Sequence, residues 1–117
     1  MKDIIELLWE DRGLLDKKEY SDAVLKTIDL LDSGAIRIAE KVNNDWVVND
    51  WIKKAVILYF PIQKMKTIEI GPLEFHDKIP LKNNYESKQI RVVPHAIARK
   101  GAYISSGVIL MPSYVNI

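Results

Sequence analysis

Small and aliphatic residues recur every six positions near the C-terminus of this 117-residue chain. One series is Ala98, Ile104 and Leu110, and glycine or serine keeps the same period at positions 101, 107 and 113. A six-residue period fits neither the 3.6-residue turn of an α-helix nor the two-residue repeat of a simple strand. It does fit a hexapeptide β-helix, in which each hexad forms one side of a triangular coil. The pattern predicts that residues 98–115 form one turn of such a coil.

A second interpretation of this segment stays open at this point. Residues 103–104 and 108–110 can instead form ordinary strands around a Ser105-Ser106-Gly107 turn. Three repeats are too few for spacing alone to decide between the two structures. A single coil also has no neighbour to cover its interior, whereas repeat architectures need about three stacked units. With the β-helix interpretation, we therefore expect the chain to be truncated, with the stabilising residues following Ile117.

The first 60 residues predict three helices, from the three- and four-residue spacing of their apolar side chains and from end signals. The first helix is expected to be capped by Asp3 and stopped by Gly13, and the second to be capped by Ser21 and stopped by Gly34. The third is expected to be capped by Asn49 or Asp50 and stopped by Pro61. The third helix is apolar on nearly all sides, so we expect it to be buried.

Two further segments complete the predicted fold. Alternation around Ile36 and Ile38, a polar turn at 43–45 and an apolar run at 46–48 predict a β-hairpin. From residue 62 to residue 89 the pattern weakens, which predicts a long, mostly irregular connection with extended pieces at 67–70. The expected fold class is α+β, with a helical domain and hairpin over residues 1–90 and the β-helical coil over residues 91–117.

Composition and charge exclude several classes of protein. Seventeen basic residues against sixteen acidic ones give a net charge of +1, with no basic block, so we expect no nucleic-acid partner. The absence of cysteine excludes disulfides, thiolate zinc sites, iron–sulfur clusters and cysteine nucleophiles. The longest apolar run, residues 55–62, is too short to span a bilayer, and the acidic N-terminus lacks the features of a secretory signal. We expect a cytoplasmic protein with no membrane partner.

Most polar candidates for chemistry have a structural explanation. His76 and His95 lie outside any metal-binding motif, and no serine lies in a G-x-S-x-G context, so no metal site or serine nucleophile is expected. Asp29 and Asp32 are expected on a solvated helix face. The three tryptophans lie within apolar patterns and are expected in the core; they are Trp9, Trp46 and Trp51.

Arg91 is the strongest candidate among the polar residues. It lies in the segment Ile90-Arg91-Val92-Val93-Pro94, directly before the repetitive region. A guanidinium group there can bind a carboxylate through two parallel hydrogen bonds. The residues alone also allow a solvent-exposed strand arginine with no ligand.

The amino-acid sequences of six short segments are more informative than the spacing of single residues. They are LLDSGAIRIAEK at 30–41, WVVNDWIKKAVILYF at 46–60, FHDKIPLK at 75–82, RVVP at 91–94, GAYI at 101–104 and LMPSYVNI at 110–117. In this order they resemble the bacterial tetrahydrodipicolinate N-succinyltransferases, a family of lysine and diaminopimelate biosynthesis. The first 29 residues match only in helical character.

The resemblance implies a fold, an activity and an assembly. The fold is an N-terminal helical domain followed by a left-handed parallel β-helix, in a homotrimer with active sites between subunits. The activity is transfer of a succinyl group from succinyl-CoA to the amino group of ring-opened tetrahydrodipicolinate, which releases CoA. Succinyl-CoA is then a co-substrate, and neither a permanently bound cofactor nor a metal is implied.

The resemblance also implies a role for Arg91, because the arginine of the family's R-V-V-P segment binds substrate. The family's general base is an aspartate downstream of the P-S-Y-V-N-I segment, so no catalytic residue is expected within this chain. His95 is a departure, since some relatives carry a second proline there. We therefore expect the N-terminal part of an acyltransferase, inactive alone. The alternatives are a non-catalytic helical binding or assembly module, and the product of a decayed gene without function.

Overall fold

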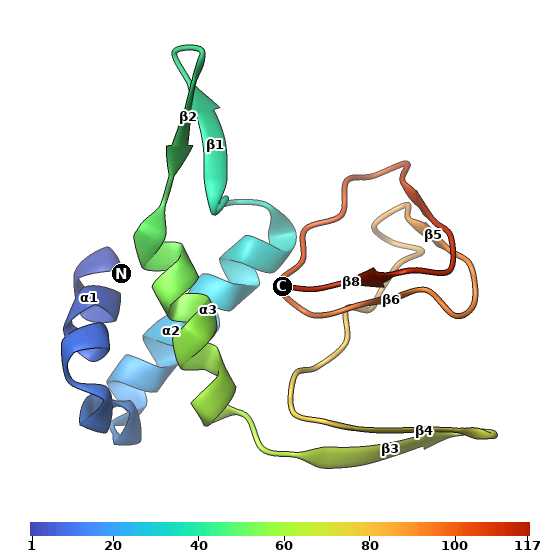
Figure 1. Cartoon of the computed structure of the whole chain (residues 1–117), viewed down its shortest axis with the longest axis horizontal. Coiled ribbons are helices and arrows are strands. Elements are labelled where there is room, and N and C mark those ends of the chain that lie inside the picture. Colours follow the sequence, from blue (N-terminus) through green and yellow to red (C-terminus); the bar gives the residue numbers. More distant parts are fainter.

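The computed structural model describes all 117 residues as a group of helices, two projecting hairpins and a coil of short parallel strands (Figure 1). The elements are α1 (Lys2–Glu10), a 3-10 helix η1 (Arg12–Asp16), α2 (Lys18–Ser33), β1 (Ala39–Val42), β2 (Asp45–Val48), α3 (Asp50–Ile62), β3 (Lys66–Ile70), β4 (Leu73–Asp77), β5 (Arg91–Val92), β6 (Ile97–Ala98), β7 (Ile109–Leu110) and β8 (Tyr114–Val115). Three α-helices with small antiparallel sheets confirm the α+β class of the N-terminal part.

The three α-helices bury one apolar cluster between them. Each contributes side chains three or four positions apart, so that one stripe of each helix faces the others. Burial of one such side chain contributes about 1.5–3 kcal/mol relative to its exposure. The cluster consists of Ile5, Leu8, Val24, Ile28, Ala55, Leu58, Tyr59 and Ile79. None of the helices combines the length and the apolar character that a membrane span requires.

The helix ends differ from the predicted ones in detail. Helix α1 begins one residue before Asp3, which lies in its first turn and is not the N-cap. Helix α2 begins at Lys18, three residues before Ser21, whose hydroxyl donates to the Lys18 carbonyl and does not cap the helix. Helix α3 includes Pro61 in its last turn and ends one residue later. The end of α2 at Gly34 is confirmed.

The hairpin predicted after α2 is confirmed, but the predicted burial of its tryptophan in the core is not. Strands β1 and β2 pair antiparallel around Asn43 and Asn44, whose φ angles of 50° and 67° suit a tight hairpin turn. Trp46 is 71% exposed, so its prediction as a core residue is wrong. The hairpin projects from the helices into solvent, and both strands are exposed along their whole length (Figure 1). Trp9 and Trp51 do pack against the core.

The connection after α3 was predicted as mostly irregular, and this prediction is wrong for its first half. Strands β3 and β4 form a second antiparallel hairpin, with Gly71-Pro72 as the turn between them. Cross-strand pairs alternate between the faces of such a hairpin. The apolar pairs Ile68–Phe75 and Ile70–Leu73 therefore share one face, and pairs such as Glu69–Glu74 lie on the other.

The repetitive segment forms parallel pairs with long sequence offsets. Arg91 pairs with Ile109, 18 positions later, and Ile97 pairs with Tyr114, 17 positions later. The alternative antiparallel pairing around residues 105–107 is not formed. Every sixth residue of the predicted series turns inward, since Ala98 and Leu110 are buried and Ile104 is half-buried.

Gly34 allows a close contact between α2 and the coil. Its φ is 80°, a left-handed conformation that costs an L-residue about 1–2 kcal/mol. A Cβ at Gly34 would lie 2.6 Å from ring carbons of Tyr103, whereas a Cβ at Gly107, whose φ is 86°, would meet nothing within 4 Å. The two glycines share a conformation but differ in crowding.

We therefore predict that Gly34→Ala destabilises the chain more than Gly107→Ala does. The first substitution adds steric overlap with Tyr103, about 1–3 kcal/mol, to the backbone cost that both share. Urea unfolding followed by circular dichroism measures the difference. Equal losses for the two variants would mean that Tyr103 moves away at no cost.

Candidate functional site

Arg91 begins β5, and backbone hydrogen bonds on both sides of it fix its position. The Arg91 N–H donates to the Val108 carbonyl at 3.1 Å, and the Val93 N–H donates to the Leu110 carbonyl at 2.9 Å. The preceding residue, Ile90, is only 6% exposed. Side chains alternate along a strand, so the inward Ile90 directs Arg91 outward. The guanidinium group of Arg91 is exposed and takes part in none of the ion pairs of the structure.

Gln89 sets the direction in which the chain enters β5. Its φ is 57°, so the backbone changes direction two residues before Arg91. The Gln89 carbonyl accepts from the Gly107 N–H at 2.8 Å, and its Oε1 accepts from the Ser106 hydroxyl at 2.9 Å. These bonds join the entry of β5 to the turn before β7. Arg91 thus lies on a locally well-fixed backbone.

An ion pair connects the end of α2 to the coil. The Lys82 side chain is 1% exposed, and its Nζ donates to Asp32 Oδ1 at 2.8 Å and to the Asp32 carbonyl at 3.0 Å. The Gly101 N–H donates to the same Asp32 Oδ1 at 2.8 Å. Asp32 thus holds both the connection and the coil against the helix.

The protonation of this ion pair follows from its contacts. Burial raises the pKa of the Asp32 carboxyl, but the hydrogen bonds from Lys82 and Gly101 and the positive charges of Lys82 and Lys88 outweigh that effect. The net result is a pKa below the ordinary value of 3.8. Asp29 lies one helical turn before Asp32 and accepts a hydrogen bond from Lys100. This hydrogen bond raises the pKa of the Lys100 ammonium group.

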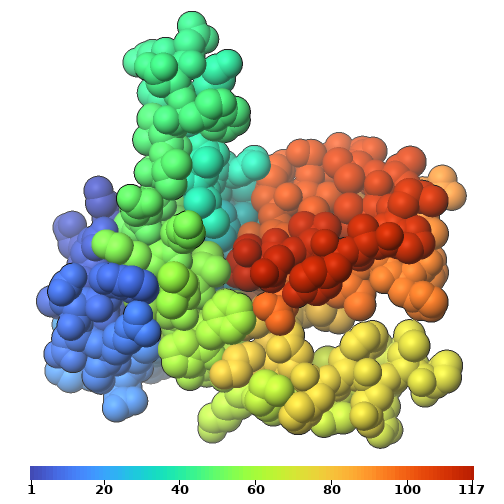
Figure 2. Space-filling view, in the orientation of Figure 1, coloured from blue at the N-terminus to red at the C-terminus, as the bar shows by residue number.

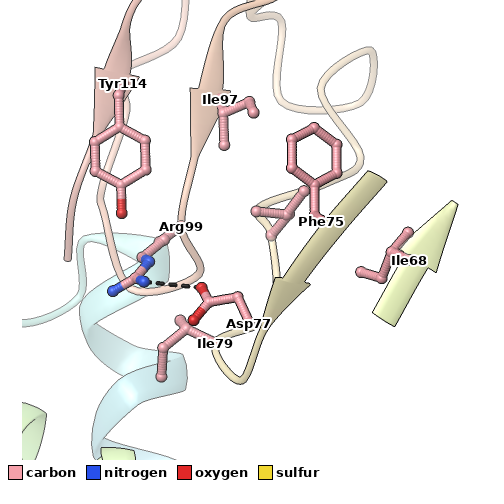
Figure 3. A pocket seen from close by; sticks show the side chains of 8 residues that line it. Ile68, Phe75, Asp77, Ile79, Ile97, Arg99 and Tyr114 are labelled. Atoms are coloured by element: carbon pink, nitrogen blue, oxygen red, sulfur yellow. Dashed lines mark hydrogen bonds and ion pairs between the residues drawn. The ribbon is translucent and has the colours of Figure 1, made fainter. Parts of the chain in front are cut away.

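A second ion pair joins the β3–β4 hairpin to the coil. Arg99 Nη2 donates to Asp77 Oδ2 at 2.8 Å, at one end of a pocket that also contains Tyr114 (Figure 3). The connection continues along the coil, where the Lys82 N–H donates to the Ala98 carbonyl at 2.8 Å. Residues 77–82 therefore run beside β6.

The other polar candidates lie apart from one another. His76 Nδ1 is 2.8 Å from the Thr67 hydroxyl on the neighbouring strand, and His95 is exposed. The Ser113 hydroxyl donates to the Met111 carbonyl. No group of three or more metal-binding side chains lies close enough together to hold an ion.

The role of Asp32 is not evident from the sequence. The pattern predicts a solvated helix face, but the Asp32 side chain is only 16% exposed and is bound to Lys82. The two residues are 50 positions apart, so no spacing rule joins them. Both lie inside stretches that carry the family resemblance, which is the one signal that pointed to these segments.

Comparison with known proteins identifies the family. The family model described as tetrahydrodipicolinate N-succinyltransferase N-terminal matches residues 1–62, which is more than half of the chain. This chain belongs to the tetrahydrodipicolinate N-succinyltransferase family. The resemblance found in the sequence is confirmed.

Relatives within the family are longer than this chain. It is 44% identical to the 2,3,4,5-tetrahydropyridine-2,6-dicarboxylate N-succinyltransferase of Pseudoalteromonas translucida, with all of the chain and 46% of that relative covered. The Bordetella pertussis enzyme of the same name is 46% identical, over 97% of the chain and 45% of the relative. The chain therefore spans slightly less than half the length of these succinyltransferases.

We predict that Asp32→Asn destabilises the chain by about 3 kcal/mol, because it leaves the buried Lys82 ammonium without a counter-charge. Urea unfolding at neutral pH measures the loss. The matched control is Asp22→Asn, which removes an exposed ion pair with Lys18 and is expected to cost less than about 1 kcal/mol. Equal effects would show that the Asp32–Lys82 pair is unimportant for stability.

The same pair predicts a dependence of stability on pH. The folded chain holds the pKa of Asp32 below 3.8, so the unfolded chain binds this proton first as the pH falls. The contribution of Asp32 is complete above that value and is lost as the pH falls through the folded pKa. The difference in unfolding free energy between wild type and Asp32→Asn should therefore be smaller at pH of about 3 than at pH of about 7. A constant difference would contradict this.

Proposed function

We propose that this chain is the N-terminal part of an enzyme that transfers a succinyl group from succinyl-CoA to tetrahydrodipicolinate in lysine and diaminopimelate biosynthesis. The observation that carries the proposal is 44–46% identity, over 97–100% of the chain, to proteins that are named for this reaction. Succinyl-CoA enters as a co-substrate. The homotrimer is proposed from the family resemblance, and the cytoplasm is proposed as the compartment of this biosynthetic reaction.

We infer that residues 91–117 begin a left-handed parallel β-helix and that residues 1–90 form the domain preceding it. The offset between Arg91 and Ile109 is three hexads, which is the length of one triangular coil. The buried Ala98 and Leu110 support an interior filled by the six-residue series. The handedness is taken from the resemblance.

The proposed role of Arg91 is to bind a carboxylate of the substrate. Tetrahydrodipicolinate carries two carboxylates, and a guanidinium group binds one of them through two parallel hydrogen bonds. Two observations support this role: Arg91 is exposed, and backbone hydrogen bonds fix the position of its main chain. The residue orients the substrate, and no acid, base or nucleophile is assigned within these 117 residues.

We place the general base in the part of the relatives that follows the segment similar to this chain. Deprotonation of the attacking amine needs a basic group within hydrogen-bond reach. The resemblance assigns that role to an aspartate after the P-S-Y-V-N-I segment, and the groove for CoA lies still further along. The chain alone is therefore expected to be inactive.

A chimeric protein tests the proposed function. This chain is joined to the remaining half of the Bordetella pertussis succinyltransferase, and release of CoA thiol from succinyl-CoA is followed with tetrahydrodipicolinate present. We expect turnover by the chimera and none by the 117-residue chain or by the isolated second half. A folded chimera without turnover would contradict the proposal, and turnover by the chain alone would contradict the assigned place of the base.

In an active chimera, we predict that Arg91→Lys raises the KM for tetrahydrodipicolinate about tenfold, because one point charge replaces a planar two-point contact. The KM for succinyl-CoA should change little. The control is Arg12→Lys on the helical side, where the arginine stacks on Trp9. An unchanged KM for the dicarboxylate would remove Arg91 from the substrate site.

A further inference from the structure

A polar hollow of about 250 Å³ lies where the end of α2 meets the coil. Figure 2 shows the segment that follows α2, in cyan, against the coil, in orange. Pockets for drug-sized ligands have volumes of about 300–1,000 Å³, so this hollow suits a small ion or the end group of a small molecule. Its walls include Asp32 and Ser33 of α2, Lys82 and Lys88 of the segment before β5, and Tyr103 and Ser106 of the coil.

Positive charge is in excess around this α2–coil hollow. Lys82 and Lys88 line it, and the guanidinium carbon of Arg37 lies 4.8 Å from the centre of the Tyr103 ring. Asp32 is the one carboxylate among the lining residues. It balances one of the three cations, so an excess of two positive charges remains. Like charges in a partly desolvated place repel one another, and a bound anion relieves that repulsion.

The contacts of Asp32 leave the Lys88 ammonium with unused donors. Asp32 Oδ1 already accepts from Lys82 and from the Gly101 N–H, and Asp32 Oδ2 is 4.0 Å from Lys88 Nζ, which is beyond hydrogen-bond length. Lys88 Nζ donates to the Asn83 carbonyl at 2.7 Å. An ammonium group carries three N–H donors, so two of them are free for a ligand. The Lys88 side chain is 34% exposed, which makes it half-buried in the wall of the hollow.

Arg37 and Tyr103 supply further donors beside Lys88. The Arg37 guanidinium lies over the Tyr103 ring, a contact that uses the face of the guanidinium and leaves its in-plane N–H groups free. Arg37 takes part in none of the ion pairs of the structure. The Tyr103 hydroxyl is a donor as well. The Ser106 hydroxyl already donates to Gln89 Oε1, so the donors to a ligand are the two cations and the phenol.

The number of charges and the directions of the donors favour phosphate over a carboxylate. A carboxylate carries one charge and accepts hydrogen bonds in one plane, whereas a phosphate group carries close to two charges and accepts from several directions. We propose that the α2–coil hollow binds a phosphate group, either as the free ion or as the end group of a small phosphorylated metabolite. Lys88, Arg37 and Tyr103 donate to its oxygens. This site is separate from Arg91 and does not depend on the proposed succinyl transfer.

Titration of inorganic phosphate into the ¹⁵N-labelled 117-residue chain, at constant ionic strength, tests the proposal. We expect saturable shifts of the amide signals of residues 33–37 and 103–106 in the nuclear magnetic resonance spectrum. The expected Kd is about 1 mM, as suits a small ion at a partly open site. Constant ionic strength, kept with sodium chloride, separates binding from general screening of charge.

Four variants assign the donors. Lys88→Gln and Arg37→Gln should each raise the Kd for phosphate about tenfold, and Tyr103→Phe, which removes only the hydroxyl, about threefold. Lys18→Gln is the matched control, because it removes the same charge as Lys88→Gln at the opposite end of α2. It should leave the Kd within about twofold of wild type. Circular dichroism confirms that each variant is folded.

Two further ligands distinguish the source of the phosphate and its chemical class. Tighter binding of glycerol 3-phosphate than of inorganic phosphate would identify a phosphorylated metabolite, and equal or weaker binding would identify the free ion; each supports the proposal. Absence of saturable shifts at the hollow, equal losses of affinity in Lys88→Gln and Lys18→Gln, or tighter binding of succinate than of phosphate would each overturn it.

Discussion

The arrangement of the chain depends on the Asp32–Lys82 ion pair. The helices form one apolar cluster, to which the coil adds only the partly buried Ile117, so polar contacts contribute to fixing their relative position. Asp32 does this by accepting from the Lys82 ammonium and from the Gly101 N–H at the same time. A buried charge is tolerated only with a partner, which makes the geometry of this contact strict. Gly34 allows the coil to come close to α2, because the absence of a side chain at this position leaves room for the Tyr103 ring.

The local features of the sequence predicted local structure well. The Gly34 stop and the Asn43-Asn44 turn are formed because a positive φ at these residues is determined within a few positions. The β3–β4 hairpin was missed although Ile68, Ile70 and Leu73 alternate correctly, because Gly71-Pro72 was interpreted as a break and not as a turn between paired strands. The six-residue period placed the inward series correctly, and the pairing of its strands required the structure.

Features that depend on distant contacts were not predictable. Nothing near Trp46 indicates that its hairpin projects beyond the helices, so its apolar neighbours suggested a core position. Asp32 and Lys82 are 50 positions apart, and each resembles an ordinary surface charge. Arg91 shows the opposite case: its position in the sequence made it a candidate, but its direction depends on the inward Ile90 and on bonds to residues beyond position 105. Family resemblance gave it an expected role.

The sequence separation of the Asp32–Lys82 contact has a consequence for the order of folding. The helical cluster, apart from Ile79, lies within the first 59 residues. Hydrogen bonds within a helix join residues four positions apart and form rapidly, whereas the parallel pairs join residues 17 or 18 positions apart. We therefore expect α2 to fold during synthesis, with Asp32 still solvated, before Lys82 and Gly101 leave the ribosome. The helical part then acts as a preformed template, on which the first strands of the coil are laid down in a fixed position.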